Sequence, residues 1–324
     1  MKASRLLLAA LAVPLAFAAA PSLAQTTLNV NTALTTDDPM YLGLERFKAG
    51  VEKRSAGKLQ VRLYPGSQLG KDEDVLEQAR AGANVAVLVD GGRLAPFVKE
   101  LGVMGAPYLV DNYDQVLRLT ASPLFGQWSD KLRQASNHQI LAFNWFQGHR
   151  HLLTNVPVKQ PADLKGVRMR TPGAPVWLET VRAMGATPTP LPWTEVYSAL
   201  QTKVIDAAEA QHPATYGSRL YEVVKYITKT EHIYLITGLV TSRGWFDKLP
   251  ADQQQIVKEE AFAAGKFASE KTIESLADYE KKMREKGVTV AEIDKTPFRK
   301  ATVGVYDKLG YTELRKDVDR ILGK

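Results

Sequence analysis

Between residues 28 and 89 the pattern of apolar and polar positions switches between a period of two and a period near 3.6. Residues 58–64 alternate apolar and polar side chains, as a half-buried strand does. Residues 85–89 are continuously apolar, which suits a sheet covered on both faces. Residues 39–55 place apolar side chains at helical spacing. With a further strand at 28–34 and a helix at 71–81, this order predicts an α/β fold with a largely parallel sheet.

The middle of the chain repeats the alternation. It predicts helices at 112–134, 175–184, 194–202 and 213–227, and strands at 139–145, 166–170, 204–208 and 233–241. The length of 324 residues indicates about two domains. Because no Gly/Ser-rich linker separates two halves, we expect the domains to be joined by structured crossovers.

One predicted helix is long enough to connect two domains. Residues 251–286 contain no proline and would extend about 54 Å, whereas a lobe of ~150 residues has a radius of gyration of only about 15 Å. The apolar face also moves, from Ile256, Ala263 and Phe267 to Ile273, Leu276 and Met283. We expect a helix that packs first on one lobe and then on the other. The alternative is a long amphipathic helix kinked near Gly265.

The N-terminus has the pattern of a secretory leader. A basic start at Lys2 and Arg5 precedes an apolar run at 6–20, and small residues at Ser22 and Ala24 fit a peptidase site before Gln25. The apolar run is shorter than the ~20 residues that span a bilayer, which disfavours a membrane anchor. We therefore interpret residues 1–24 as a signal peptide.

Composition and charge narrow the remaining classes of protein. Apolar residues make up 45% and charged residues 24%, which excludes a disordered or collagenous chain. Removal of Lys2 and Arg5 lowers the net charge from +7 to +5, and no basic run indicates nucleic acid or a membrane surface. The absence of cysteine fits export to an oxidising compartment and excludes thiol catalysis and Cys-ligated zinc.

Two sequence motifs that could indicate a phosphate or metal site do not meet the requirements of such sites. Residues 65–72 resemble a phosphate loop but have the wrong spacing, with Asp72 where Ser or Thr should hold magnesium. His149 and His151 would share one face of a strand, but a metal site needs further ligands, and exposed strand-end histidines are the better interpretation. No nucleophile motif nominates an active site, so the sequence predicts no catalytic residue, metal or cofactor, although a carboxylate pair stays possible.

Two arginines at strand ends are the strongest candidates for a site. Arg170 ends the strand at 166–170, just before Thr171-Pro172-Gly173, and ligands of open α/β sheets bind beyond the carboxyl ends of strands. Its planar guanidinium matches a carboxylate or phosphate. Arg150 follows the strand at 139–145 and has the same two interpretations, an anion site or an ion pair within the fold.

Asp90 and Trp193 are further candidates. Asp90 ends the apolar strand 85–89 and could accept a hydrogen bond from a ligand hydroxyl or N–H, or simply form the turn with Gly91 and Gly92. Trp193, between Pro192 and Thr194, is either a pocket wall or a core aromatic residue.

Three segments together resemble a known family. They are 65–70 (PGSQLG), 166–172 (GVRMRTP) and 195–206 (EVYSALQTKVID), and the similarity extends over nearly the whole chain after the leader. The chain resembles the extracytoplasmic solute-binding proteins of TRAP (tripartite ATP-independent periplasmic) transporters, of the DctP type.

The resemblance implies a two-lobed periplasmic binding fold, type II-like, with a long helix bridging the lobes. We expect lobe I at about 25–149 plus 235–268, and lobe II at about 150–234 plus 269–324. It also implies that Arg170 pairs with a substrate carboxylate, with Arg150 near the pocket, Asp90 at a ligand-contacting position and Trp193 as an aromatic wall. The complete set of expected ligand-binding residues is Arg170, Arg150, Asp90, Trp193, Trp145, Phe146, Gln211 and Thr36.

The chain departs from the family pattern in ways that bear on the ligand. Ala210 replaces an Asn that often contacts ligand, so Gln211, Glu209 or His212 would have to substitute, and Gly173 replaces an Asn of sialic-acid binders. A nine-carbon sugar acid is therefore disfavoured. One carboxylate on arginine and one donor facing Asp90 predict a small hydroxy acid or a cyclic amino-acid derivative such as pyroglutamate. A C4-dicarboxylate is the alternative ligand.

The partners and the location follow from the same resemblance. We expect a periplasmic protein, monomeric or homodimeric, that delivers its ligand to a TRAP membrane permease driven by an ion gradient. A binding protein that feeds a sensor kinase and a secreted α/β hydrolase are the competing hypotheses.

Overall fold

The computed structural model describes residues 26–324, so the predicted leader lies outside the described residues. The strands are β1 (Thr26–Asn31), β2 (Leu59–Tyr64), β3 (Val85–Asp90), β4 (His138–Thr154), β5 (Arg168–Thr171), β6 (Thr187–Pro190), β7 (Ala207–Ala210), β8 (Tyr226–Ser242) and β9 (Thr289–Ala291). The α-helices are α1 (Pro39–Arg54), α2 (Asp72–Arg80), α3 (Gly91–Leu94), α4 (Tyr113–Thr120), α5 (Pro123–Ser136), α6 (Pro175–Ala183), α7 (Val196–Gln201), α8 (His212–Gly217), α9 (Arg243–Phe246), α10 (Ala251–Glu285), α11 (Thr296–Thr302), α12 (Gly304–Lys308) and α13 (Thr312–Leu322). Short 3₁₀ turns are η1 (Lys99–Gly105), η2 (Pro161–Leu164), η3 (Trp193–Glu195) and η4 (Leu220–Glu222).

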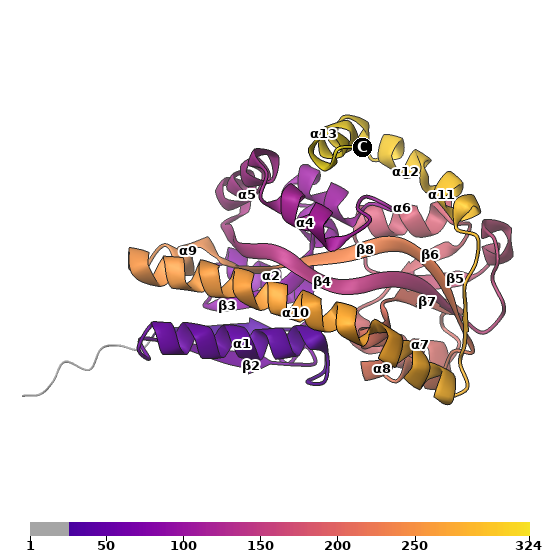
Figure 1. Ribbon diagram of the computed structural model, residues 1–324, viewed down its shortest axis with the longest axis horizontal. Helices are drawn as coiled ribbons and strands as arrows, with labels where there is room; N and C mark the ends of the chain where they lie inside the picture. The colour runs from indigo at the N-terminus through magenta and orange to yellow at the C-terminus, as the bar shows by residue number, and fades with distance from the viewer. Residues whose placement is uncertain (1–25) are drawn as a thin grey trace, which may run out of the picture.

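Within the described residues, the strands form one mixed sheet of nine strands, in the order β2-β1-β3-β8-β4-β7-β5-β6, with β9 on β8. The first lobe lies on the β2-β1-β3 side and the second lobe on the β7-β5-β6 side. The 17-residue strands β4 and β8 run antiparallel through both (Figure 1). The α/β fold class is therefore confirmed.

The apolar pattern explains why helices cover both faces of this sheet. In β3, Val85, Val87 and Val89 face the core cluster beneath α4 and α5, whereas Ala86 and Leu88 face the cluster beneath α1 and α10. In the second lobe, Leu152 and Leu153 of β4 likewise face opposite clusters. The continuous apolar runs therefore encode burial on both sides.

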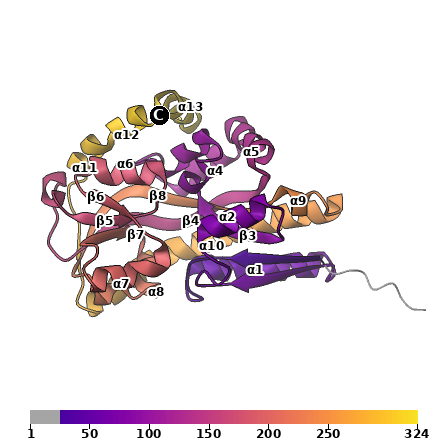
Figure 2. The same cartoon turned by 180° about the vertical axis from the view of Figure 1, so that it is seen from behind.

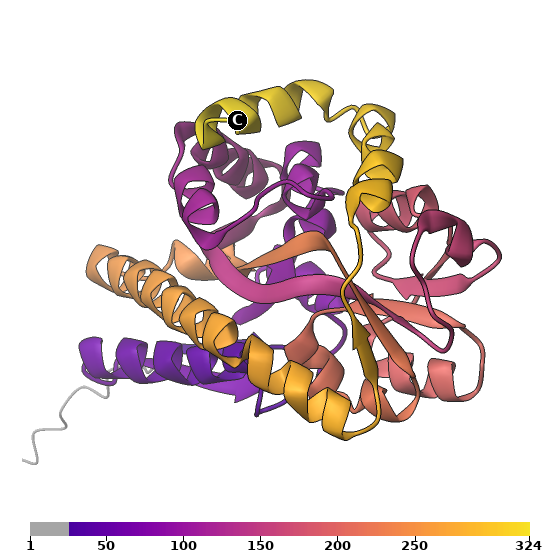
Figure 3. The same cartoon turned by 45° about the vertical axis from the view of Figure 1, so that its right-hand side comes forward.

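Helix α10 bridges the two lobes, as predicted. Its 35 residues run beside α1 and continue to α8 in the second lobe (Figures 1 and 3). Val257 and Ala261 pack in the core with α1, and Met283 packs in the core of the second lobe. Ile273, expected on the second apolar face, is instead 48% exposed.

Small residues set the close contact between α10 and the first lobe. A Cβ atom at Gly265 would collide with Asn144 and Trp145, and one at Gly43 of α1 would collide with Ala268. The buried face of the helix therefore depends on Ala, Gly and Ser at these positions. The expected apolar face, defined mainly by large side chains, did not include these small residues.

Two predicted helices are wrong in extent. The helix expected at 112–134 is divided into α4 and α5, because Ser122 caps the second helix and Pro123 cannot donate to the preceding turn. The helix expected at 213–227 ends at Gly217, and β8 already begins at Tyr226.

The lobe boundaries stay a prediction, because β4, β8 and α10 belong to both lobes. The C-terminal helices also join them. Helix α12 packs on α6, while α13 packs on α4 and places Val318 and Leu322 in the core cluster of the first lobe (Figure 3). Among the described residues, no helix is long and apolar enough to cross a membrane.

Candidate ligand-binding cleft

The β2-β1-β3 part and the β7-β5-β6 part of the sheet lie on either side of the molecule (Figure 2). A cleft opens between the two lobes at the carboxyl ends of β1, β3, β5 and β7. An inner cavity of about 60 Å³ is lined by residues from both lobes, and a wider cavity of about 300 Å³ continues from it toward solvent. Ala33, Asp72, Arg93, Pro172 and Trp193 line both cavities. This is where an open α/β sheet binds its ligand.

Arg170 is a buried cation without a carboxylate partner. Its side chain is 1% exposed, and its Nε and Nη2 atoms donate to the Leu191 carbonyl oxygen at 2.9 and 2.7 Å. The guanidinium lies 5.4 Å from the centroid of the Trp193 ring. No carboxylate in the described part of the chain lies within ion-pair distance of it. Burial and the nearby charge of Arg150 lower the pKa of Arg170 to about 9.

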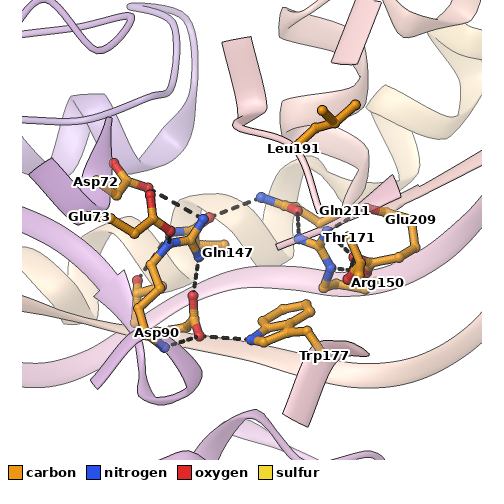
Figure 4. Close-up of polar contacts among 12 residues, drawn as sticks. Asp72, Glu73, Asp90, Gln147, Arg150, Thr171, Trp177, Leu191, Glu209 and Gln211 are labelled. Carbon is orange, nitrogen blue, oxygen red and sulfur yellow. Dashed lines mark hydrogen bonds and ion pairs between the residues drawn. The ribbon is translucent and has the colours of Figure 1, made fainter. Parts of the chain in front are cut away.

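Arg150 is buried too, but its charge is compensated. It forms an ion pair with Glu209, which is fully buried, and its Nη1 atom donates to Gln211 Oε1 at 3.1 Å (Figure 4). Thr171 also donates to Glu209 Oε1, at 2.9 Å. Although burial opposes it, Arg150 and His232 lower the pKa of Glu209 to about 2. Glu209 is therefore ionised and neutralises Arg150.

Asp90 lies in the cleft, but both of its carboxylate oxygens have partners. One pairs with Arg93, and the other accepts from Trp177 Nε1 at 2.9 Å (Figure 4). Asp90 also caps α3 by accepting from the Arg93 backbone N–H. These contacts leave it a weaker candidate for accepting a ligand donor than the sequence indicated.

Asp72, at the start of α2, is a stronger candidate for accepting a hydrogen bond from the ligand. It lies 3.7 Å from Arg93 Nη2, but its Oδ1 atom is buried without a hydrogen-bond partner in the described structure. Burial raises the pKa of Asp72 to about 6. Asp72 lines both cavities, and a carboxylate with an unsatisfied oxygen can accept a hydrogen bond from a ligand hydroxyl.

The structure brings five of the eight predicted residues together. Arg150, Arg170, Asp90, Trp193 and Gln211 all line the inner cavity. Gln211 also donates to Gln147 Oε1 at 2.9 Å (Figure 4).

The other three predicted residues do not line the cleft. Trp145 is fully buried in the core beneath α10, and Phe146 stacks on Tyr234 in the opposite core, with ring centroids 3.9 Å apart. Thr36 is exposed in the loop before α1. Irregular pairing between β4 and β8 around Phe146 and Gly148 turns Gln147, not its aromatic neighbours, toward the cavity.

Four residues of the cleft are absent from the set of ligand-binding residues predicted from the sequence: Asp72, Arg93, Gln147 and Trp177. Each lies in the cleft through contacts between distant segments. Only Arg93 had a local signal, as the first charged residue after Asp90-Gly91-Gly92.

Three of the histidines, His149, His151 and His212, lie together outside the two cavities. The ring centroids of His151 and His212 are 4.5 Å apart, with His149 nearby, and all three have lowered pKa values because they are buried. Among the described residues, no group of His, Cys, Asp and Glu could hold a metal ion. His151 is buried, His149 is partly buried and both lie within β4, so the expectation that they are exposed strand-end histidines is wrong.

We expect His212 to make the fold sensitive to acid. Burial lowers its pKa to about 4 from an ordinary 6.5, so between these pH values the unfolded chain binds a proton that the folded chain does not. The free energy of unfolding should therefore fall as the pH drops from about 6.5 toward 4. His212→Asn should show a smaller decrease in melting temperature between pH 7 and 4.5 than the parent protein. Parallel curves of melting temperature against pH would contradict this.

Comparisons with known proteins identify the family and the fold. A sequence model of the DctP family, described as bacterial extracellular solute-binding proteins of family 7, matches residues 30–313. A TRAP periplasmic solute-binding protein from Escherichia fergusonii, in an apo open structure, is 48% identical, with a TM-score of 0.80 over 91% of this chain and 99% of that chain. One from Ochrobacterium anthropi with bound L-fuconate is 32% identical, with a TM-score of 0.89 over 92% and 100%. One from Actinobacillus succinogenes with bound L-galactonate is 30% identical, with a TM-score of 0.88 over 92% and 99%.

The two ligand-bound structures match this chain more closely than the open one does, despite their lower sequence identity. The lobes described here are therefore arranged more like those of the ligand-bound relatives.

Proposed function

We propose that this chain, which belongs to the DctP family of bacterial extracellular solute-binding proteins, captures a singly charged sugar acid of about six carbons and delivers it to a TRAP permease. The family consists of periplasmic substrate-binding transport proteins, so the hydrolase hypothesis is set aside. The predicted signal peptide is consistent with the periplasm.

One observation carries the choice of ligand. Three arginines line the inner cavity, and two of them are paired with carboxylates: Arg150 with Glu209, and Arg93 with Asp90, Asp72 and Glu73. Arg170 alone has no carboxylate partner among the described residues. A single uncompensated cation favours a ligand with one carboxylate, since a second would lie in the cleft unpaired.

The rest of the cleft suits a polyhydroxylated chain. Asp72 offers an unsatisfied acceptor, and Gln147 and Gln211 offer amides that can donate or accept. Trp193 supplies a flat wall, and the outer cavity of about 300 Å³ leaves room for carbons beyond the carboxylate. L-Fuconate and L-galactonate, bound by two relatives, have this chemistry. Pyroglutamate lacks the row of hydroxyls and becomes the less favoured ligand.

Titration calorimetry against matched acids tests the proposal. We expect L-fuconate, L-galactonate or D-glucuronate to bind at least 100-fold more tightly than neutral L-fucose (about 2.7 kcal/mol), because only the acids can pair with Arg170. Succinate and pyroglutamate should bind more weakly than the best sugar acid. Preferential binding of succinate, or equal binding of L-fucose, would contradict the proposal.

A sensor kinase remains the alternative partner to a permease. Genes for TRAP permease subunits beside the gene for this chain would support transport, and a sensor-kinase gene in their place would support signalling.

A further inference from the structure

Trp177 lies where the two lobes meet at the floor of the cleft. It comes from α6, in the β5–β6 connection of the second lobe, yet its Nε1 atom donates to Asp90 at the end of β3 in the first lobe (Figure 4). Trp177 is 1% exposed and Asp90 is 2% exposed. A buried hydrogen bond to a charged acceptor belongs to the stronger class of such bonds.

The first lobe has a notch that receives this indole. A Cβ atom at Gly92 would collide with Trp177 Nε1, and one at Gly105 would come within 3.4 Å of the same atom. Both positions lie in the α3–η1 segment, so the absence of side chains there creates the space for a side chain of the other lobe.

The face of the Trp177 ring contacts an arginine of the second lobe. The Arg150 guanidinium lies 4.6 Å from the centroid of the Trp177 ring. This stacking adds a cation–π contact to the pair with Glu209. One side chain therefore connects the Asp90–Arg93 pair of the first lobe with the Arg150–Glu209 pair of the second.

We propose that Trp177 is a positioning residue that stabilises the closed arrangement of the lobes, with Asp90 as its receptor instead of a ligand contact. The inference rests on the proposed function only in taking lobe closure as the step that traps the ligand. Trp177 acts through Asp90 and Arg150 and does not itself hold the acid.

The absence of cysteine from the chain allows a direct test by crosslinking. Lys71 Nζ and Glu195 Oε1 lie 3.7 Å apart across the rim of the cleft, and both side chains are about half exposed. In a Lys71→Cys, Glu195→Cys background, a dilute, short bifunctional thiol reagent should crosslink only closed molecules. Because the reagent is dilute, opening and closing of the lobes is fast relative to crosslinking. The rate of crosslinking is then proportional to the fraction of molecules that are closed.

We expect Trp177→Phe to slow crosslinking about tenfold (about 1.4 kcal/mol), because it keeps the ring but removes the N–H that Asp90 accepts. Gly92→Ala should slow it similarly by filling the notch from the other lobe. The matched control is Trp245→Phe, because Trp245 is also buried in the first lobe but its Nε1 atom has no hydrogen-bond partner in the described structure. That control should crosslink at the rate of the background, with all variants folded by circular dichroism.

The inference is overturned if Trp177→Phe and Gly92→Ala crosslink at the background rate, if Trp245→Phe slows it equally, or if the background does not crosslink at all. A separate arm adds L-fuconate, L-galactonate or D-glucuronate to the background. Failure of every acid to accelerate crosslinking counts against the proposed ligand class, while the comparison among ligand-free variants still decides the role of Trp177.

Discussion

Arg170→Met is expected to abolish ligand binding without destabilising the protein. The substitution removes the cation that would hold the carboxylate, so the Kd for the best sugar acid should rise at least 100-fold (about 2.7 kcal/mol). The free protein should melt at the same temperature or higher, because Arg170 is 1% exposed and lacks a carboxylate partner. Replacing an uncompensated buried charge with an unbranched apolar side chain removes a cost of desolvation. Calorimetry and thermal melting on the same samples measure both effects.

Arg168→Met is the matched control, two residues earlier on β5. Arg168 is 48% exposed and pairs with Asp206 at 2.8 Å, outside the cleft. Its replacement should leave the Kd unchanged within about twofold. If Arg170→Met weakened binding by less than tenfold, Arg170 would not be the residue that holds the carboxylate. A large decrease in the melting temperature of the Arg170→Met variant would contradict the claim that the charge of Arg170 is uncompensated.

Glu209→Gln is expected to have the opposite effect, a large loss of stability. Glu209 is fully buried and ion-paired with Arg150, so the neutral amide would leave that guanidinium buried without its counter-charge. Removing one partner of a buried pair costs about 3 kcal/mol or more. Chemical denaturation should show this as a lower free energy of unfolding. Because Arg150 lowers the pKa of Glu209 to about 2, this stability is present above about pH 4.5 and is lost as the pH falls toward 2.

Glu77→Gln on α2 serves as the control for Glu209→Gln. Glu77 is 57% exposed and pairs only with Arg80, one turn away. Exposed pairs of this kind contribute about 0–1 kcal/mol, so its replacement should change stability little. An equal effect of the two substitutions would mean that the Arg150–Glu209 pair does not stabilise the fold.

These two predictions assign different roles to the two buried arginines of the cleft. Arg150 and Glu209 form a compensated pair that stabilises the second lobe, whereas Arg170 stays uncompensated in the free protein and is available to a ligand. The proposed binding position, Arg170, is therefore also a position that lowers the stability of the free protein. The distinction between the two arginines is electrostatic, because both lie in the same cavity.

The fold could be predicted largely because its signals are local. The continuous apolar run of β3 and the uninterrupted helix formers of α10 each encode one element and its burial. The full length of β4 and β8 could not be predicted, because their crossing between the lobes includes Gly148, charged residues and buried histidines. In the sequence alone, a glycine and polar side chains of this kind predict a loop and not a buried strand.

The site divides in the same way. Arg170 could be found because the end of β5 is visible in the sequence and the chemistry of its guanidinium is a property of one residue. Arg150 was identified by the same argument, but the expectation that it follows a strand is wrong, because it lies within the long strand β4. Whether each arginine is neutralised depends on Glu209, 59 positions away from Arg150, which no local pattern reveals. Trp145 was misplaced because the irregular pairing of β4 with β8 changes which side chains face the cleft.

The central claim is that one carboxylate of the ligand pairs with Arg170. A crystal structure of residues 25–324 with L-fuconate, L-galactonate or D-glucuronate, whichever binds most tightly, tests this pairing. We expect electron density for a polyhydroxylated chain whose carboxylate oxygens lie at hydrogen-bond distance, about 2.7–2.9 Å, from the Arg170 guanidinium, with a hydroxyl near Asp72. A ligand whose carboxylate lies on Arg93 or Arg150 instead, or a neutral ligand that leaves Arg170 on Leu191 alone, would contradict it.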